Sequence, residues 1–177
     1  MAAKQKGTLK TTYKKLAASA MFIALTAFAT AYFLHIPIGA NGGYIHLGDT
    51  FIYLAASLLP LPYAAAAAAL GGGLADLLSG APAWILPTMI IKPLSVLCFS
   101  SKGSGLIIRR NLFALPAAGL VSTLGYFLAE TAFTRSWQAA LLVQWGNLLQ
   151  WGGSVVLYLL VAAALDRLDA KKRFYSF

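Results

Sequence analysis

The sequence contains few charged residues, and this scarcity argues against a soluble fold. Only 11% of the 177 residues are Asp, Glu, Lys or Arg, whereas 59% are hydrophobic. A soluble domain has roughly 25% charged residues, and a water-facing surface cannot be built from so few. The apolar residues also come in blocks of near bilayer length with the charges between them, which indicates that lipid is the solvent.

Acidic residues and cysteine are scarcer still. Five acids stand against fourteen Lys and Arg, so the formal net charge is +9. The basic residues flank apolar segments, which indicates a membrane surface and not a nucleic-acid partner. The single cysteine, Cys98, excludes an intrachain disulfide and a cysteine metal cluster.

Several catalytic motifs are missing. The sequence has no G-x-x-x-x-G-K-[ST] phosphate loop, no HExxH, no GxSxG and no Cys/His spacing for a metal. We therefore expect no enzyme activity, no catalytic residue, no metal and no cofactor. A nucleotide-driven role would need an ATPase on another chain.

The apolar blocks predict an all-α integral membrane protein with six transmembrane helices. A glycine-rich loop, 37–46, follows the first span, the second span is short, and Pro87 and Pro93 predict a bent or broken fourth span. The expected spans are 16–36, 47–59, 63–78, 84–99, 112–133 and 137–165.

The basic residues predict the orientation. Five precede the first span, three lie in the loop 100–111 and four lie in the tail, whereas the outer loops hold only Arg135 and Lys92 lies within a span. The positive-inside rule then puts both termini in the cytoplasm. The expected organisation is a basic cytoplasmic segment 1–15, a membrane domain 16–166 and a basic cytoplasmic tail 167–177.

Four ionisable residues lie in or beside the spans, where charges are costly and often functional. Asp49, Asp76, Lys92 and Glu130 all fall in the outer half, with Lys92 roughly 12 Å deep at about 1.5 Å per residue. One interpretation is an ion pair of Lys92 with Asp76 or Glu130, with Asp49 and Glu130 in headgroup water. The other is a polar cavity open to the outside.

The sixth span favours the cavity. Gln144, Asn147 and Trp151 have i, i+3, i+7 spacing and share one helix face, with Gln150 beside them. Amides with indoles suit a planar, hydrogen-bonding ligand. The alternative is an interfacial aromatic belt with helix–helix hydrogen bonds, but Asn147 is roughly 15 Å inward, too deep for a belt.

The first outer loop completes the expected site, because Asn41, Tyr44 and His46 can close over the cavity. The predicted ligand-binding residues are Asn41, Tyr44, His46, Asp49, Trp84, Lys92, Glu130, Gln144, Asn147 and Trp151.

A stripe of alanines marks the first span. Ala20 and Ala24 are four residues apart, as are Ala27 and Ala31. Small residues at this spacing allow close helix packing. The contact is either within the chain or with another membrane subunit.

Three segments have a recognisable pattern: Gly43–Ala56 (GYIHLGDTFIYLAA), Gly71–Gly80 (GGGLADLLSG) and Pro87–Pro93 (PTMIIKP). They resemble the S components of energy-coupling factor (ECF) transporters, in particular the subgroup for hydroxymethylpyrimidine and pyridoxine-type vitamins. The alanine stripe resembles the family's Ala-x-x-x-Ala signature, and the length and six helices fit along the whole chain.

The resemblance implies a substrate-binding subunit in the plasma membrane of a prokaryote. Such a subunit binds a vitamin from outside and docks, through the alanine stripe of helix one, onto a transmembrane T component with two ATPases. ATP turnover then topples it so that its site opens inward. Two other hypotheses remain: an integral-membrane enzyme acting on a lipid-like substrate, and a stand-alone channel or carrier.

Overall fold

The fold is a helical bundle with one small hairpin. The computed structural model describes the backbone of residues 2–33, 35–38 and 43–176, and the side chains there except those of 2–8, 10, 37, 38, 43 and 44. Helix α1 (Ala2–Tyr32) leads into strands β1 (Ile36–Ile38) and β2 (Gly43–Ile45), which pair antiparallel with Ile36 opposite Ile45.

The remaining elements are helices. Two short helices, α2 (Asp49–Leu58) and α4 (Ile85–Ser95), flank the longer α3 (Leu61–Leu78), and a 3₁₀ turn, η1 (Pro82–Trp84), leads into α4. Helices α5 (Arg109–Thr134) and α6 (Trp137–Arg167) follow, and the chain ends with the short α7 (Ala170–Tyr175).

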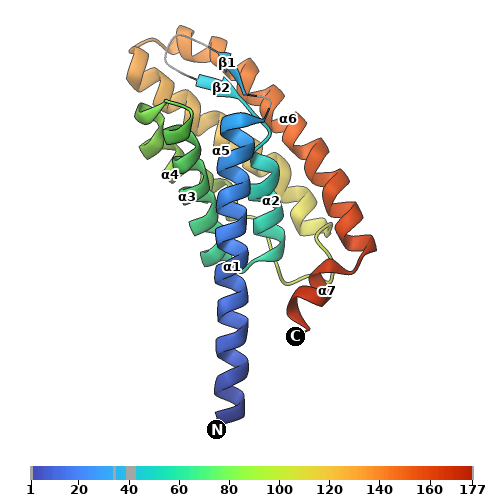
Figure 1. Cartoon of the computed structure of the whole chain (residues 1–177). Helices are drawn as coiled ribbons and strands as arrows, with labels where there is room; N and C mark the ends of the chain where they lie inside the picture. The colour runs from blue at the N-terminus through green and yellow to red at the C-terminus, as the bar shows by residue number, and fades with distance from the viewer. Residues whose placement is uncertain (1, 34, 39–42, 177) are drawn as a thin grey trace.

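Six helices close into a ring. Each packs against the next in the order α1, α3, α4, α5, α6, α2 and back to α1. Figure 1 shows the hairpin at one end of this ring, and the start of α1 and α7 at the opposite end. We call these the hairpin end and the terminal end.

The length of the helices separates four of them from the rest. Within the described residues, four helical segments are long and apolar enough to cross a bilayer: 11–32, 61–78, 109–134 and 137–167. Helices α2 and α4 have 10 and 11 residues, roughly 15–17 Å of rise against a hydrocarbon core of about 30 Å. Four described helices are thus long and apolar enough to span a bilayer alone, and the six spans predicted from the sequence stay a prediction.

The first and fourth spans end earlier than predicted. Helix α1 stops at Tyr32, and Ile36, the predicted last residue of the first span, begins β1 instead. Pro37 explains this, because proline lacks an N–H and disfavours helix at the residue before it. Pro93 lies in the last turn of α4, which ends at Ser95 instead of Phe99.

Glycines bring the helices of one side of the ring close together. A Cβ at Gly71 would lie 2.9 Å from the Thr26 Cβ on α1, and one at Gly72 would lie 2.6 Å from the Thr88 Cγ2 on α4. Only residues without a side chain allow such an approach. The Gly71–Gly73 run therefore fixes α3 between α1 and α4.

Towards the terminal end, aromatic side chains fill the interior of the bundle. Tyr53 and Phe99 stack with ring centroids 5.5 Å apart, and Tyr158 meets both edge-on. The Tyr158 hydroxyl lies 2.8 Å from the Ser57 Oγ and donates to the Leu106 carbonyl at 3.1 Å. This aromatic cluster fills the interior between α2, α6 and the segment after α4.

Helix α7 folds back and fastens two neighbouring segments. The Lys171 Nζ donates to the Ser57 and Gly105 carbonyls, each at 2.9 Å, and the Lys171 side chain is buried. The Ser57 carbonyl belongs to the last turn of α2, where a cation is favourable because of the helix dipole. The ammonium thus joins α2 and the α4–α5 loop to α7.

Replacing Lys171 with methionine should lower the melting temperature of the purified protein, because two buried carbonyls lose their donor, at a cost of about 1–3 kcal/mol. Lys172 provides a matched control. Its side chain is exposed and pairs only with the equally exposed Asp169, so Lys172→Met should change stability very little. Equal melting temperatures for the two variants would contradict this role of Lys171.

Candidate functional site: a polar cavity inside the helix ring

The ring encloses a cavity lined by polar and aromatic side chains. Its empty volume is about 600 Å³ when the open space at its mouth is included. Most lining residues lie near the helix ends that face the hairpin. The lining residues are Thr26, Thr30, His46, Asp49, Ile52, Gly72, Ala75, Asp76, Trp84, Thr88, Lys92, Tyr126, Glu130, Val143, Asn147 and Gln150.

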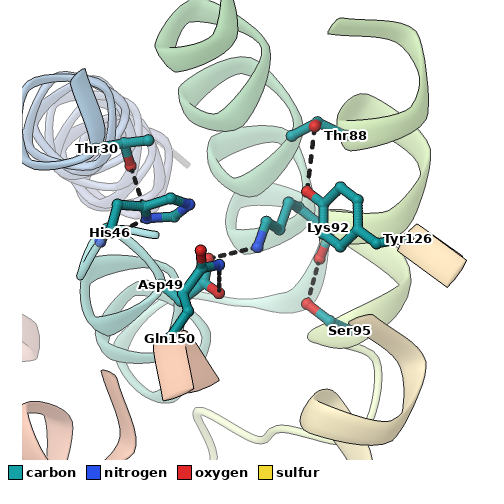
Figure 2. A network of polar contacts seen from close by, with 9 residues as sticks. Thr30, His46, Asp49, Thr88, Lys92, Ser95, Tyr126 and Gln150 are labelled. Atoms are coloured by element: carbon teal, nitrogen blue, oxygen red, sulfur yellow. Dashed lines mark hydrogen bonds and ion pairs between the residues drawn. The ribbon is translucent and has the colours of Figure 1, made fainter. Parts of the chain in front are cut away.

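A buried ion pair crosses the cavity. The Lys92 Nζ on α4 lies 2.6 Å from the Asp49 Oδ1 at the first residue of α2, and both side chains are 3% exposed. Figure 2 shows the lysine reaching across from α4. The Lys92 stem passes Gly72, where a Cβ would lie in ordinary van der Waals contact with the Lys92 Cγ at 3.4 Å. A helix N-terminus further stabilises the Asp49 carboxylate.

The second carboxylate oxygen of Asp49 is also occupied. The Gln150 amide on α6 donates to the Asp49 Oδ2 at 3.1 Å. The Lys92 Nζ lies 5.2 Å from the centre of the Tyr126 ring, and the Tyr126 hydroxyl lies 3.1 Å from the Thr88 Oγ1. The pair therefore links α2, α4, α5 and α6, as Figure 2 shows.

His46 holds the start of α2 against α1. The Gly48 backbone N–H donates to the His46 Nδ1 at 3.0 Å, and the Thr30 Oγ1 lies 3.3 Å from the same nitrogen. An Nδ1 that accepts an N–H must carry a lone pair, so the proton of the neutral ring is on Nε2. Burial lowers the pKa of His46 to about 3, and the imidazole is neutral at physiological pH.

Two further carboxylates line the cavity. Asp76, near the end of α3, is 5% exposed, and Glu130, near the end of α5, is 4% exposed. Together with Asp49 they place acids on three different helices around one cavity. Among the described lining residues, Lys92 is the single lysine or arginine.

An aromatic wall stands at the hairpin end of the cavity. Trp84, in the η1 turn, is 6% exposed, and its ring meets Phe133 edge-on at 5.1 Å and lies 5.8 Å from Tyr126. Such a wall provides a flat surface on which a planar ring can stack.

Comparison with known proteins identifies the family. The family model described as ECF-type riboflavin transporter, S component, matches residues 10–167, nearly the whole chain. The chain belongs to this family. The members of this family are described as S components of ECF-type transporters, which are membrane transport subunits. The description names riboflavin, and not the hydroxymethylpyrimidine and pyridoxine-type subgroup that the three sequence segments resemble.

One curated relative of this S component is similar over part of the chain. An uncharacterized protein in a gap 3′ region of Pyrococcus woesei is 35% identical over 99 residues, which are 55% of this chain and 66% of that protein. The chain thus matches slightly less than two thirds of that relative, which is described without an activity.

The structure places six of the predicted ligand-binding residues of the S component around the cavity: His46, Asp49, Trp84, Lys92, Glu130 and Asn147. Asn41 lies outside the described residues, and the Tyr44 side chain is likewise not described. Lys92 pairs with Asp49 and not with Asp76 or Glu130 as the sequence suggested. Asp49 is correspondingly buried and not in headgroup water.

Two predicted residues lie outside the cavity lining. The Trp151 Nε1 donates to the Leu115 carbonyl on α5 at 2.9 Å, and its indole lies where a Cβ of Gly119 would be. Gln144 donates to the Ala140 carbonyl of its own helix and accepts from Asn147. Trp151 therefore packs α5 against α6. Gln144 does not line the cavity but accepts a hydrogen bond from the Asn147 amide.

Sequence reasoning omitted several lining residues. Thr26, Thr30 and Thr88 were not singled out, although Thr26 and Thr30 have helical spacing within an apolar span. Gln150 was noted beside Asn147, and Asp76 was considered as an ion-pair partner or a cavity residue, but both were left out of the predicted site. Tyr126 gave no signal, because an isolated tyrosine in an apolar span also suits a membrane interface.

The predicted alanine stripe of the S component divides between two faces of α1. Ala20 and Ala24 are exposed, Ala27 is buried and Ala31 is partly buried. The burial of Ala27 has a simple cause, since it faces the neighbouring helices of the ring. Among the described side chains of α1, the exposed small residues are instead Ala17, Ala20 and Ala24, which we call the α1 alanine face.

Proposed function

We propose that this S component captures a small heterocyclic vitamin or vitamin precursor from outside a prokaryotic cell and delivers it inward across the plasma membrane. The observation that carries this proposal is the polar cavity inside a ring of apolar helices. Buried polar groups are costly in a membrane protein unless they serve a ligand or pair with one another. The four charged lining residues, Asp49, Asp76, Lys92 and Glu130, come from four different helices, α2, α3, α4 and α5.

The lining favours a planar ring with hydrogen-bonding groups. Trp84 and Tyr126 offer aromatic surfaces, and Asn147 and the threonines offer donors and acceptors. Hydroxymethylpyrimidine and pyridoxine have this character, in line with the three sequence segments. Riboflavin is the second candidate, because the family description names it.

The orientation follows from the charges. The basic residues of the loop 100–111 and of the tail belong to the terminal end, and the hairpin lies at the opposite end. With the terminal end in the cytoplasm, the cavity is nearer the outside. The chain then traverses the bilayer six times, with the short α2 and α4 supported by the ring and not by lipid on all sides.

Transport requires partners. We propose that a transmembrane T component with two ATPases binds the α1 alanine face, where small exposed side chains allow a partner helix to approach closely. ATP turnover would then topple the S component and open its cavity inward. The competing functions are a membrane enzyme and a stand-alone carrier. The first usually has acidic motifs facing the cytoplasm, and the second would work without a T component.

Mass spectrometry of small molecules released from the purified protein tests the binding role. We expect one dominant heterocyclic compound. Asn147→Leu should weaken rebinding of that compound at least about tenfold, or about 1.4 kcal/mol, because Asn147 lines the cavity and its amide is lost.

Trp145 provides the matched control for this variant. It lies two residues away on α6, is 72% exposed and points away from the cavity, so Trp145→Leu should leave the affinity unchanged. If Asn147→Leu folds normally and binds as tightly as the wild type, Asn147 is not part of the site.

A further inference from the structure

We propose that the ligand is a planar heterocycle that turns hydrogen-bond donors towards α6, from amino or hydroxyl groups on neighbouring positions of one edge. This inference rests on the proposed function and specifies the substrate class of the same cavity. It is carried by two amide side chains of α6, Asn147 and Gln150, whose hydrogen bonds fix which of their atoms a ligand meets.

Three residues of α6 line the cavity. Val143, Asn147 and Gln150 are spaced i, i+4 and i+7, so they share one helix face. The valine contributes an apolar contact, and the two amides are the polar groups that α6 contributes. A carboxamide has an acceptor oxygen and a donor nitrogen. The orientation of each amide therefore decides what a ligand must offer.

A chain of two hydrogen bonds sets the orientation of the Asn147 amide. The Gln144 Nε2 donates to the Ala140 carbonyl at 2.9 Å. Because a carbonyl only accepts, the Gln144 oxygen is the atom left for Asn147. That oxygen needs a donor, and the Asn147 Nδ2 provides it at 2.9 Å. The Asn147 nitrogen therefore faces Gln144, which does not line the cavity, and the Asn147 oxygen remains for a ligand.

The Asp49 carboxylate sets the orientation of the Gln150 amide. The Gln150 Nε2 donates to the Asp49 Oδ2 at 3.1 Å, while Lys92 donates to the Asp49 Oδ1. A carboxylate paired with an ammonium only accepts, so the reverse orientation of the amide would bring two oxygens together. Figure 2 shows the Gln150 amide beside this carboxylate. The Gln150 oxygen remains for a ligand, as at Asn147.

Two acceptor oxygens on one helix face require donors on the ligand. Residues at i and i+3 have Cβ atoms roughly 5–6 Å apart, so one small molecule can reach both amides. A ligand that turned acceptors towards these oxygens would leave buried acceptors facing each other, which is costly. The lining threonines set no such requirement, because a hydroxyl can donate or accept.

This requirement separates the candidate ligands. Hydroxymethylpyrimidine has an amino group and a hydroxymethyl group on neighbouring ring atoms, and pyridoxine has hydroxyl-bearing groups on three neighbouring ring atoms. The pyrimidine edge of the riboflavin ring system has one N–H between two carbonyl oxygens, and these carbonyls would face the amide oxygens of α6. The α6 face therefore favours the first kind of ligand over riboflavin.

Binding of matched probes to the purified full chain in lipid nanodiscs tests the inference. The probes are hydroxymethylpyrimidine, two analogues in which a methyl group replaces either its amino group or its hydroxyl group, and riboflavin. A methyl group has nearly the size of the group it replaces but donates no hydrogen bond. We expect hydroxymethylpyrimidine to bind at least about tenfold more tightly than either analogue and than riboflavin.

Two methionine variants assign this preference to α6. Gln144→Met changes no lining residue but frees the Asn147 amide to turn, so Gln144 is tested as a positioning residue. It should reduce the preference over at least one analogue at least about threefold, and so should Gln150→Met, which removes an acceptor. Gln138→Met is the matched control. Gln138 is exposed at the start of α6 and accepts from Ser136, so both preferences should stay unchanged.

The results separate the two levels of the proposal. An analogue or riboflavin that binds at least as tightly as hydroxymethylpyrimidine, or preferences that neither Gln144→Met nor Gln150→Met alters, would overturn the donor inference and leave the binding role intact. If none of the probes binds, the compound released from the purified protein decides. Amino or hydroxyl groups on neighbouring ring positions support the inference, a compound without them contradicts it, and a chain that releases nothing contradicts the proposed function as well.

Discussion

Replacing Lys92 with methionine is expected to destabilise the folded chain by about 3–5 kcal/mol, because Asp49 is left as a buried carboxylate without its cation. Both side chains are 3% exposed and their charged atoms are 2.6 Å apart, so water cannot replace the ammonium. Thermal unfolding of the detergent-solubilised protein, followed by size-exclusion chromatography, measures the effect.

The double variant Asp49→Asn/Lys92→Met serves as the control. It removes both charges while keeping the Gln150 contact available to the new amide, and it should recover most of the lost stability. A single variant as stable as the double variant would show that the ion pair does not hold α2 and α4 together.

Replacing Ala24 with tryptophan should abolish uptake of the native ligand while leaving binding unchanged. Ala24 is exposed on the α1 alanine face and does not line the cavity. An indole at this position would keep a partner helix from approaching the small residues. Uptake should fall at least about tenfold, the equivalent of 1.4 kcal/mol in coupling to the partner.

A tryptophan at a lipid-facing position of another helix provides the comparison. Leu120 on α5 is 61% exposed, and Leu120→Trp should transport normally. Uptake by Ala24→Trp at the level of Leu120→Trp would count against the α1 alanine face as the docking surface.

The sequence predicted the gathering of the charged residues better than it predicted their partners. Depth within each span grouped Asp49, Lys92 and Glu130 near one end, and the structure brings all three to one cavity. Depth carries no information about which helices are neighbours, however. Lys92 pairs with Asp49 because the ring order places α2 and α4 across the interior from each other, and no local pattern encodes that order.

The cavity-lining face of α6 was predicted less well, because residues with the spacing of one stripe contact different parts of the molecule. Asn147 and Trp151 have the spacing of one stripe, but α6 packs against both α5 and α2. The stripe therefore divides, with Asn147 at the cavity and Trp151 bonded to α5. Likewise the glycine-rich segment after α1 was predicted to be a loop, because a three-residue strand such as β1 is too short to give a periodic signal in the sequence.

Reconstitution of transport tests the central claim most directly. The compound released from the purified chain is offered to proteoliposomes that contain either this chain alone or this chain with a T component and two ATPases. We predict ATP-dependent uptake only when all the subunits are present, together with their co-purification as one complex. Uptake by this chain alone, at the same rate and without ATP, would contradict the account.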